Sequence, residues 1–380
     1  MTTLSVVDRP SQFQVLPILY LMNQAQLEKF IVYLQRQKWL IFGPSESPIK
    51  TRKTETSPYL TAHSESEIKT KTGGISINRI NRPSDLVLDS RLPFFSFKRF
   101  FIPEKETLFE YQSNLLKEKK IFHRTALLGV NILDLKAINL YDQVFEKDPY
   151  YQVRRRRLLI IGHSFVPEIE KNFFEHQYEE DILEHLPFDI FLADWRLTAG
   201  DHQFKVFTSS FRGQRILEHF GYQDYEHIQF SGSVKENQPD QRMIKLRDKL
   251  KNSHNQKIWD KLGQKCIECG KCTIACPTCF CFRVEDEPSL KNKAGVRRRC
   301  WDSCFYQEFS EVAGPSTSSG QAGHKFLSNA AARIHFWYFH KFARIPDEFD
   351  FMGCVGCGRC SRVCPVNIDI KKVLEQIEES

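Results

Sequence analysis

The first 265 residues of this 380-residue chain contain no cysteine. The chain also lacks a run of about 18 apolar residues, the length that a membrane-spanning helix needs, and its first residues lack the basic stretch and apolar run of a secretory signal. We therefore expect a cytoplasmic protein without membrane insertion. Neither G-x-G-x-x-G nor G-K-[ST] is present, so the sequence does not support an independent nucleotide site.

A strong charge of one sign is missing as well. The formal net charge is +7, which would help to dock an acidic partner protein but is far weaker than the concentrated basic face of a nucleic-acid binder. We expect no nucleic-acid partner. Four consecutive arginines, Arg154 to Arg157, are interpreted as solvated surface or as a contact for an acidic subunit.

Cysteine is concentrated near the C-terminus, where all twelve cysteines lie between residues 266 and 364. Two runs, starting at Cys266 and at Cys354, share the spacing C-x2-C-x2-C-x3-C-P. In bacterial ferredoxins with this spacing, three cysteines hold one [4Fe-4S] cluster and the fourth crosses to the other cluster. The spacing therefore predicts cluster 1 at Cys266, Cys269, Cys272 and Cys364, and cluster 2 at Cys276, Cys354, Cys357 and Cys360.

Residues between these cysteines fit the same interpretation. Gly270, Gly356 and Gly358 permit left-handed backbone and expose amide N–H groups to sulfur. The basic residues Lys271, Arg359 and Arg362 are interpreted either as charges that raise the reduction potentials or as surface contacts.

Structural zinc is the main alternative for these runs, because C-x2-C pairs also hold zinc. Zinc closes with four ligands, usually as two separated pairs, and does not require three evenly spaced cysteines and a fourth before proline, twice. Disulfides are disfavoured because the chain before Cys266 contains no cysteine and no secretory signal points to an oxidising compartment.

Four cysteines remain after two clusters are assigned: Cys279, Cys281, Cys300 and Cys304. They form a C-x-C and a C-x3-C pair, and their number matches the ligands of a third [4Fe-4S] cluster or of a tetrahedral zinc. We favour a third cluster. The alternative is that some of them are buried free thiols.

The front of the chain alternates strand-like and helix-like patterns, which predicts a cysteine-free α/β domain over residues 1–235. A helix is expected over residues 23–38, with Leu27, Phe30, Ile31 and Leu34 on one face. Strands are expected over residues 126–130 and 158–163, and Asp134 is expected to cap the helix between them.

A helical connector is expected over residues 236–264, followed by a ferredoxin-type [4Fe-4S] dicluster domain over residues 265–380 with a long insert at 282–353. A closing helix is expected after Cys364 from the apolar spacing of Ile370, Val373, Leu374 and Ile377. The expected fold class is α+β, with an N-terminal α/β domain followed by a mostly helical two-cluster ferredoxin-type domain.

Several segments carry a resemblance to a known family. They include S-F-K-R-F-F-I-P-E-K-E-T-L-F (96–109), A-L-L-G-V-N-I-L-D-L-K-A-I (126–138), C-P-T-C-F-C (276–281) and R-C-W-D-S-C (299–304), besides the second cysteine run. The chain resembles the iron-sulfur beta subunit of cytoplasmic NiFe sulfhydrogenases and the related A subunit of anaerobic sulfite reductase. The resemblance implies an electron-carrying subunit between a flavoprotein reductase subunit that handles pyridine nucleotide and a catalytic oxidoreductase subunit.

We accordingly expect a chain that relays single electrons through adjacent clusters and carries out no bond chemistry of its own. A flavin on a partner would divide the electron pair that nicotinamide delivers as hydride. The alternative is an iron-sulfur enzyme whose front domain binds a substrate or a flavin. A third class keeps the clusters for structural or regulatory reasons.

Overall fold

The structure is a computed structural model. It describes residues 21–46, 74–89, 91–112, 115–118, 123–164, 180–195, 203–232, 241–253, 257–289, 294–312 and 324–379. The predicted boundary at residue 235 lies outside these ranges.

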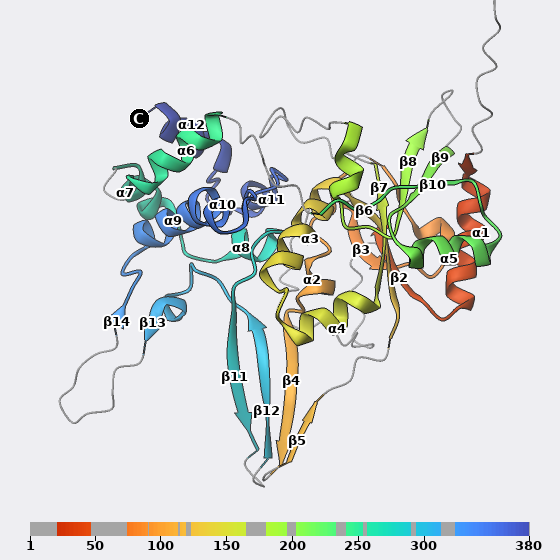
Figure 1. Cartoon of the computed structure of the whole chain (residues 1–380). Helices are drawn as coiled ribbons and strands as arrows, with labels where there is room; N and C mark the ends of the chain where they lie inside the picture. Colours follow the sequence, from red (N-terminus) through yellow and green to blue (C-terminus); the bar gives the residue numbers. More distant parts are fainter. Residues whose placement is uncertain are drawn as a thin grey trace, which may run out of the picture.

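An eight-stranded sheet organises the front of the chain (Figure 1). Its order is β1-β9-β8-β7-β6-β2-β3, and β10 also pairs with β9. The strands β2, β6, β7 and β8 are parallel to one another. The strand β3 runs antiparallel to β2, and β9 runs antiparallel to both β8 and β1. The strand β10 is parallel to β9. The strands are β1 (Met22–Asn23), β2 (Leu40–Ser45), β3 (Ser76–Arg79), β6 (Thr125–Asn131), β7 (Leu158–His163), β8 (Ile190–Trp195), β9 (Gln203–Thr208) and β10 (Tyr225–His227).

Helices cover both faces of this sheet (Figure 1). One face packs against α1 (Gln24–Arg36) and α5 (Phe211–Phe220), through a cluster that includes Leu27, Phe30 and Leu217. The other packs against α2 (Lys98–Phe101), α3 (Ile132–Val144) and α4 (Pro149–Arg157). Short 3-10 turns, η1 (Pro83–Asp85) and η2 (Glu180–His185), complete this part. Both strand faces are therefore buried, which explains the near-continuous apolar composition of β6 and β7.

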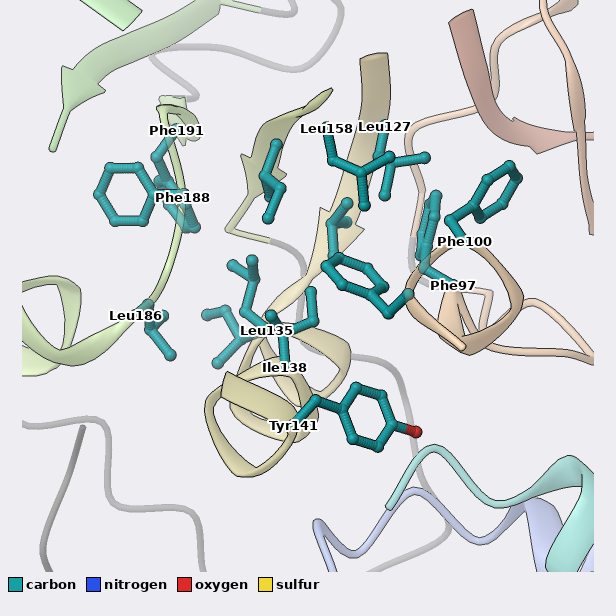
Figure 2. Packing of buried hydrophobic residues seen from close by; sticks show 14 of the residues in the cluster. Phe97, Phe100, Leu127, Leu135, Ile138, Tyr141, Leu158, Leu186, Phe188 and Phe191 are labelled. Carbon is teal, nitrogen blue, oxygen red and sulfur yellow. The ribbon is translucent and has the colours of Figure 1, made fainter. Parts of the chain in front are cut away.

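The apolar core between the sheet and the helices α2, α3 and α4 ends beside the cysteine-rich region. Figure 2 shows Tyr141 of α3 at its edge, with the hydroxyl directed away from the sheet toward the C-terminal chain. That hydroxyl donates to the carbonyl oxygen of Pro277, so the sheet domain contacts the first cysteine run directly.

A separate four-stranded sheet joins the two halves of the chain. Its order is β11-β12-β4-β5, and all its pairs are antiparallel. The strands β4 (Lys105–Gln112) and β5 (Leu115–Glu118) come from the front of the chain, and β11 (Phe282–Pro288) and β12 (Ala294–Trp301) follow the first cysteine run. Buried Arg299 of β12 binds Glu106 of β4, with Nη2 2.6 Å from Oε2, and thereby ties the hairpin to the front domain.

The C-terminal part is mainly helical. The helices α6 (Gln241–Lys251), α7 (Lys257–Lys265), α9 (Ala330–Phe339) and α12 (Ile370–Glu379) pack around one apolar core. The helix α10 (Ile345–Phe349) packs through Ile345 and Phe349 in a second cluster that also includes Leu133 of α3. Short helices α8 (Lys271–Ala275) and α11 (Arg359–Val363) carry cysteines. A π-helical segment, η4 (His340–Arg344), continues α9 into α10. The 3-10 turn η3 (Gln307–Ser310) and the paired strands β13 (Glu311–Val312) and β14 (His324–Lys325) lie between β12 and α9 in the sequence.

Several local predictions are confirmed. The chain mixes helices and sheets; Leu27, Phe30, Ile31 and Leu34 of α1 are buried; and α12 buries Ile370, Val373, Leu374 and Ile377. The predicted cap of α3 is wrong: Asn131 is the cap, and its side chain accepts from the amide of Asp134, whose carboxylate is engaged elsewhere. Within the described ranges, every helix is too short or too polar to cross a membrane.

Candidate metal centres

The two cysteine runs adopt the same local conformation. Gly270 and Gly358 are left-handed, with φ of 67° and 66°, and each precedes a five-residue helix, α8 or α11, that ends in an extended cysteine, Cys276 or Cys364. The left-handed turn carries the chain around so that consecutive cysteines point inward. The two short helices pack against each other, which brings the runs together.

The first predicted ligand set lies around one cavity. Cys266, Cys269 and Cys272 of the first run and Cys364 of the second line a space of about 50 Å³. The other lining residues are largely apolar, including Phe305, Ile334 and Trp337. Two backbone amides point at these sulfurs: Glu268 N lies 3.4 Å from Cys266 Sγ, and Ile368 N lies 3.2 Å from Cys364 Sγ.

The second predicted set is buried more deeply. Burial raises the pKa of Cys354 to about 12, and it raises the pKa of Cys357 and Cys360 as well, with further increases from the charge of Cys276. Gly356 N lies 3.4 Å from Cys354 Sγ, repeating the contact at Cys266. The thiols of the two runs therefore lie close enough to act on one another.

Cys272 and Cys360 connect the two sets. Cys360 belongs to the second set but also lines the cavity of the first, and the charge of Cys272 contributes to the raised pKa of Cys360. The two groups of thiols are thus adjacent.

The four remaining cysteines are not arranged alike. Cys279 and Cys281 follow the first run. Burial, together with the charge of Cys281, raises the pKa of Cys304, so Cys281 and Cys304 lie near each other. Cys300 lies on β12 and its Sγ is 3.4 Å from Glu285 Oε2. Burial raises the pKa of Cys300, Glu285 raises it further, and Lys105 and Arg283 lower it. These three residues belong to the four-stranded sheet.

Two buried lysines adjoin the first run, and sequence reasoning missed both. Lys98 Nζ donates to the carbonyl oxygens of Thr273, Ile274 and Cys276 at 3.2 to 3.4 Å and lies 4.0 Å from the centroid of the Trp301 ring. It thereby places a cation at the C-terminal end of α8, where the carbonyls of a helix favour positive charge.

The second is Lys341 of η4, whose Nζ is 3.2 Å from Cys276 Sγ. A hydrogen bond from Cys279, together with Lys341, lowers the pKa of Cys276. The sequence held a signal for this lysine: Lys341 lies in a helical segment rich in aromatic residues, 334–343, and a charge that is buried in such a segment requires partners.

Arg359, which stands between Cys357 and Cys360, is paired with the sheet domain. Its side chain is fully buried, and Nη1 and Nη2 lie 2.6 and 3.1 Å from the two carboxylate oxygens of Asp134. Its charge is therefore balanced by a carboxylate, so the interpretation of Arg359 as a surface contact is wrong.

The residues fit iron-sulfur clusters in chemistry and arrangement. All twelve cysteines are free thiols, thiolate sulfur is the ligand that [4Fe-4S] clusters require, and amide N–H groups are directed at several of the sulfurs. Among the described residues, no three His, Cys, Asp or Glu side chains meet at a spacing that suits a single metal ion.

Comparison with known proteins adds independent information. A protein family described as a 4Fe-4S dicluster domain matches residues 265–368. The chain is also similar to sulfhydrogenase 2 subunit beta of Pyrococcus furiosus, with 30% identity over 309 residues that span 79% of this chain and 88% of that protein. No solved structure gives a significant match.

Proposed function

Because the chain belongs to the family of sulfhydrogenase beta subunits, we propose that it is an electron-transfer subunit that relays single electrons through two [4Fe-4S] clusters. The observation that carries this proposal is the position of Cys364, from the second run, beside Cys266, Cys269 and Cys272 of the first around one cavity. Such exchange of the fourth cysteine is how two-cluster ferredoxins are built.

The proposed ligands of cluster 1 are Cys266, Cys269, Cys272 and Cys364, and those of cluster 2 are Cys276, Cys354, Cys357 and Cys360. When bound, a [4Fe-4S] cluster takes up and releases one electron at a time. The chain's own residues would exclude water through the apolar walls formed by Phe305, Ile334 and Trp337 and would donate amide N–H groups to sulfur. The adjacent Cys272 and Cys360 would mark a short route between the clusters.

The proposed partners are those that membership of the family suggests. We propose that the chain assembles with a flavoprotein reductase subunit and with a catalytic oxidoreductase subunit of hydrogenase type in the cytoplasm. The domain division at residues 235 and 265 is part of this proposal, with the α/β domain as the scaffold onto which the cluster domain packs. Supporting contacts are the hydroxyl of Tyr141 on Pro277 and the Asp134–Arg359 ion pair.

A third metal group at Cys279, Cys281, Cys300 and Cys304 is also proposed. Its support is the ligand count and the proximity of Cys281 and Cys304. It requires Cys300 to leave its contact with Glu285.

One cavity favours the enzyme alternative. A space of about 550 Å³ lies between the sheet domain and α10, lined by polar and aromatic residues that include Asp142, Arg155, Phe188 and Phe349. This size suits a small organic ligand. The alternative predicts an organic cofactor or substrate bound stoichiometrically to the purified single chain, whereas the relay predicts a brown protein without flavin absorbance.

The relay is tested by Cys357→Ser in the anaerobically isolated complex. We expect electron flow through the complex to be abolished while each partner's own half-reaction is retained. The matched control is Glu375→Gln on α12, outside both ligand sets, which should retain electron flow. Full electron flow in the Cys357→Ser complex would contradict the relay.

A further inference from the structure

Lys341 has an unusual set of contacts for a lysine. Its side chain is 2% exposed, and Nζ donates to Cys276 Sγ at 3.2 Å, to Thr278 Oγ1 at 2.9 Å and to the carbonyl oxygen of Gly353 at 2.9 Å. Three acceptors match the three protons of an ammonium group. The side chain is therefore held as a cation at one sulfur of the second ligand set.

The backbone is shaped to place it there. The helix that begins with α9 widens into the π-helical segment η4, whose five residues include Lys341, and such π-helical turns occur frequently at functional sites. The carbonyl oxygen of Lys341 accepts from the amide of Gly353 at 3.0 Å. A Cβ at Gly353 would lie 2.5 Å from that oxygen, so only glycine permits this close approach.

The contacts of Lys341 differ from those of Arg359 and Lys98, two other buried cations near these cysteines. Arg359 is paired with the carboxylate of Asp134 and also lowers the pKa of Cys357, which burial raises, and Lys98 donates to backbone carbonyls. The acceptors of Lys341 are a thiol, a hydroxyl and a carbonyl, so its charge lies against a ligand sulfur without a carboxylate among these contacts.

We propose that Lys341, acting through the ligand Cys276, raises the reduction potential of the cluster held by Cys276, Cys354, Cys357 and Cys360. This inference rests on the proposed function, because it requires a cluster at those cysteines. Reduction adds one negative charge to a cluster, and a cation that touches a ligand sulfur stabilises the reduced form more than the oxidised form.

Burial makes this effect larger than that of a surface lysine. Water screens exposed charges strongly, whereas a pair in the interior interacts through a lower effective dielectric constant. The effect also falls with distance, so the cluster at Cys266, Cys269, Cys272 and Cys364 should respond less. The predicted result is a difference in potential between the two clusters that favours electron residence at the second.

Lys341 also has a mechanical role that the test must separate from its charge. Through Cys276, Thr278 and Gly353 it links the end of the first run to the residue before Cys354. A variant that loses these contacts risks losing the cluster as well as the charge.

The test is a redox titration of the anaerobically purified full chain, followed by EPR, together with iron content. Lys341→Gln and Lys341→Met remove the charge, and Lys341→Arg retains it. Lys372→Gln, at an exposed lysine on α12, controls for the loss of one positive charge. We expect the Gln and Met variants to lower the potential of one cluster with a smaller shift of the other, and the Arg and Lys372→Gln variants to stay near wild type.

Unchanged potentials in an iron-replete Lys341→Gln or Lys341→Met chain would overturn the inference. An equal fall in Lys341→Arg would also overturn it, because shape and not charge would then be responsible. If both uncharged variants lose iron while Lys341→Arg retains it, the residue holds the cluster and the tuning role is rejected. A wild-type chain without iron would instead contradict the proposed function itself.

Discussion

Arg359 and Asp134 form a buried two-armed ion pair between the second cysteine run and the first turn of α3, with N–O distances of 2.6 and 3.1 Å. The two residues are 225 positions apart. The side-chain amide of Asn131 also donates to the same carboxylate at 3.2 Å. The sheet domain thus fixes the position of the residue between Cys357 and Cys360.

The first prediction concerns this pair. Asp134→Asn should lower the free energy of unfolding by about 3–5 kcal/mol, because it leaves a buried guanidinium without its carboxylate. The Asp134→Leu, Arg359→Met double variant should recover most of the loss, since a well-packed apolar pair replaces the charges. Denaturation of the anaerobically prepared chain measures both effects.

The control is Asp85→Asn, which breaks the exposed Arg82–Asp85 pair and should have little effect. A loss in Asp134→Asn no larger than in this control would show that the buried pair does not hold the two parts together.

The second prediction concerns Gly353. Its Cβ in Gly353→Ala would lie 2.5 Å from Lys341 O and 2.8 Å from Lys341 Cα, both backbone atoms that cannot move aside. We expect the loop before Cys354 to shift and the iron content to fall by about four per chain. Iron analysis with EPR measures this.

Gly221→Ala is the matched control, because Gly221 has a φ of 88° but has nothing within 4 Å of the position that a Cβ would take. It should cost only about 1–2 kcal/mol of backbone strain and leave the iron content unchanged. Wild-type iron in Gly353→Ala would refute the close-approach argument.

The third prediction concerns pH. Burial, with repulsion from Lys341 and Arg344, lowers the pKa of His340 to about 4 from an ordinary value of 6.5. Between these values the unfolded chain binds more protons than the folded chain. Stability should therefore decrease as pH falls from about 6.5 to about 4, by on the order of 3 kcal/mol, and this contribution should be constant above that range.

His340→Phe, which keeps an aromatic ring beside Phe336, should flatten this part of the pH dependence. His219→Gln, at an exposed histidine on α5, should not. Denaturation at about pH 7 and about pH 5 compares them; an unchanged slope in His340→Phe would reject the assignment.

The fourth prediction concerns the third cysteine set. Three clusters correspond to about 12 irons per chain and two clusters to about 8, so we expect about 12 in wild type and about 8 in Cys304→Ser after anaerobic reconstitution. Cys300→Ser tests the membership of the thiol that lies against Glu285. About 8 irons in wild type would refute the third cluster.

Local spacing was sufficient to predict much of the cysteine region. The left-handed glycines, the repeated turn and helix of the two runs, and the buried face of α12 all depend on residues within a few positions of one another. The buried face of α1 was predictable for the same reason.

Contacts between distant segments were not predictable in this way. The sequence pattern of Arg154 to Arg157 indicates solvated surface or a contact for an acidic subunit, yet Arg154 is 4% exposed and pairs with Glu106, because β4 returns to that helix. The pairing of β12 with β4 and the role of Lys341 likewise depend on partners far away in the sequence. Lysine and arginine carry the same sequence signal whether solvated or buried, so only the tertiary partner distinguishes them.

The most direct test of the central claim is the iron, acid-labile sulfide and zinc content of the anaerobically purified full chain, with EPR of the reduced protein. The account predicts at least about 8 irons with matching sulfide, no zinc, and the signals of reduced [4Fe-4S] clusters. A colourless chain that contains zinc and no iron would contradict it.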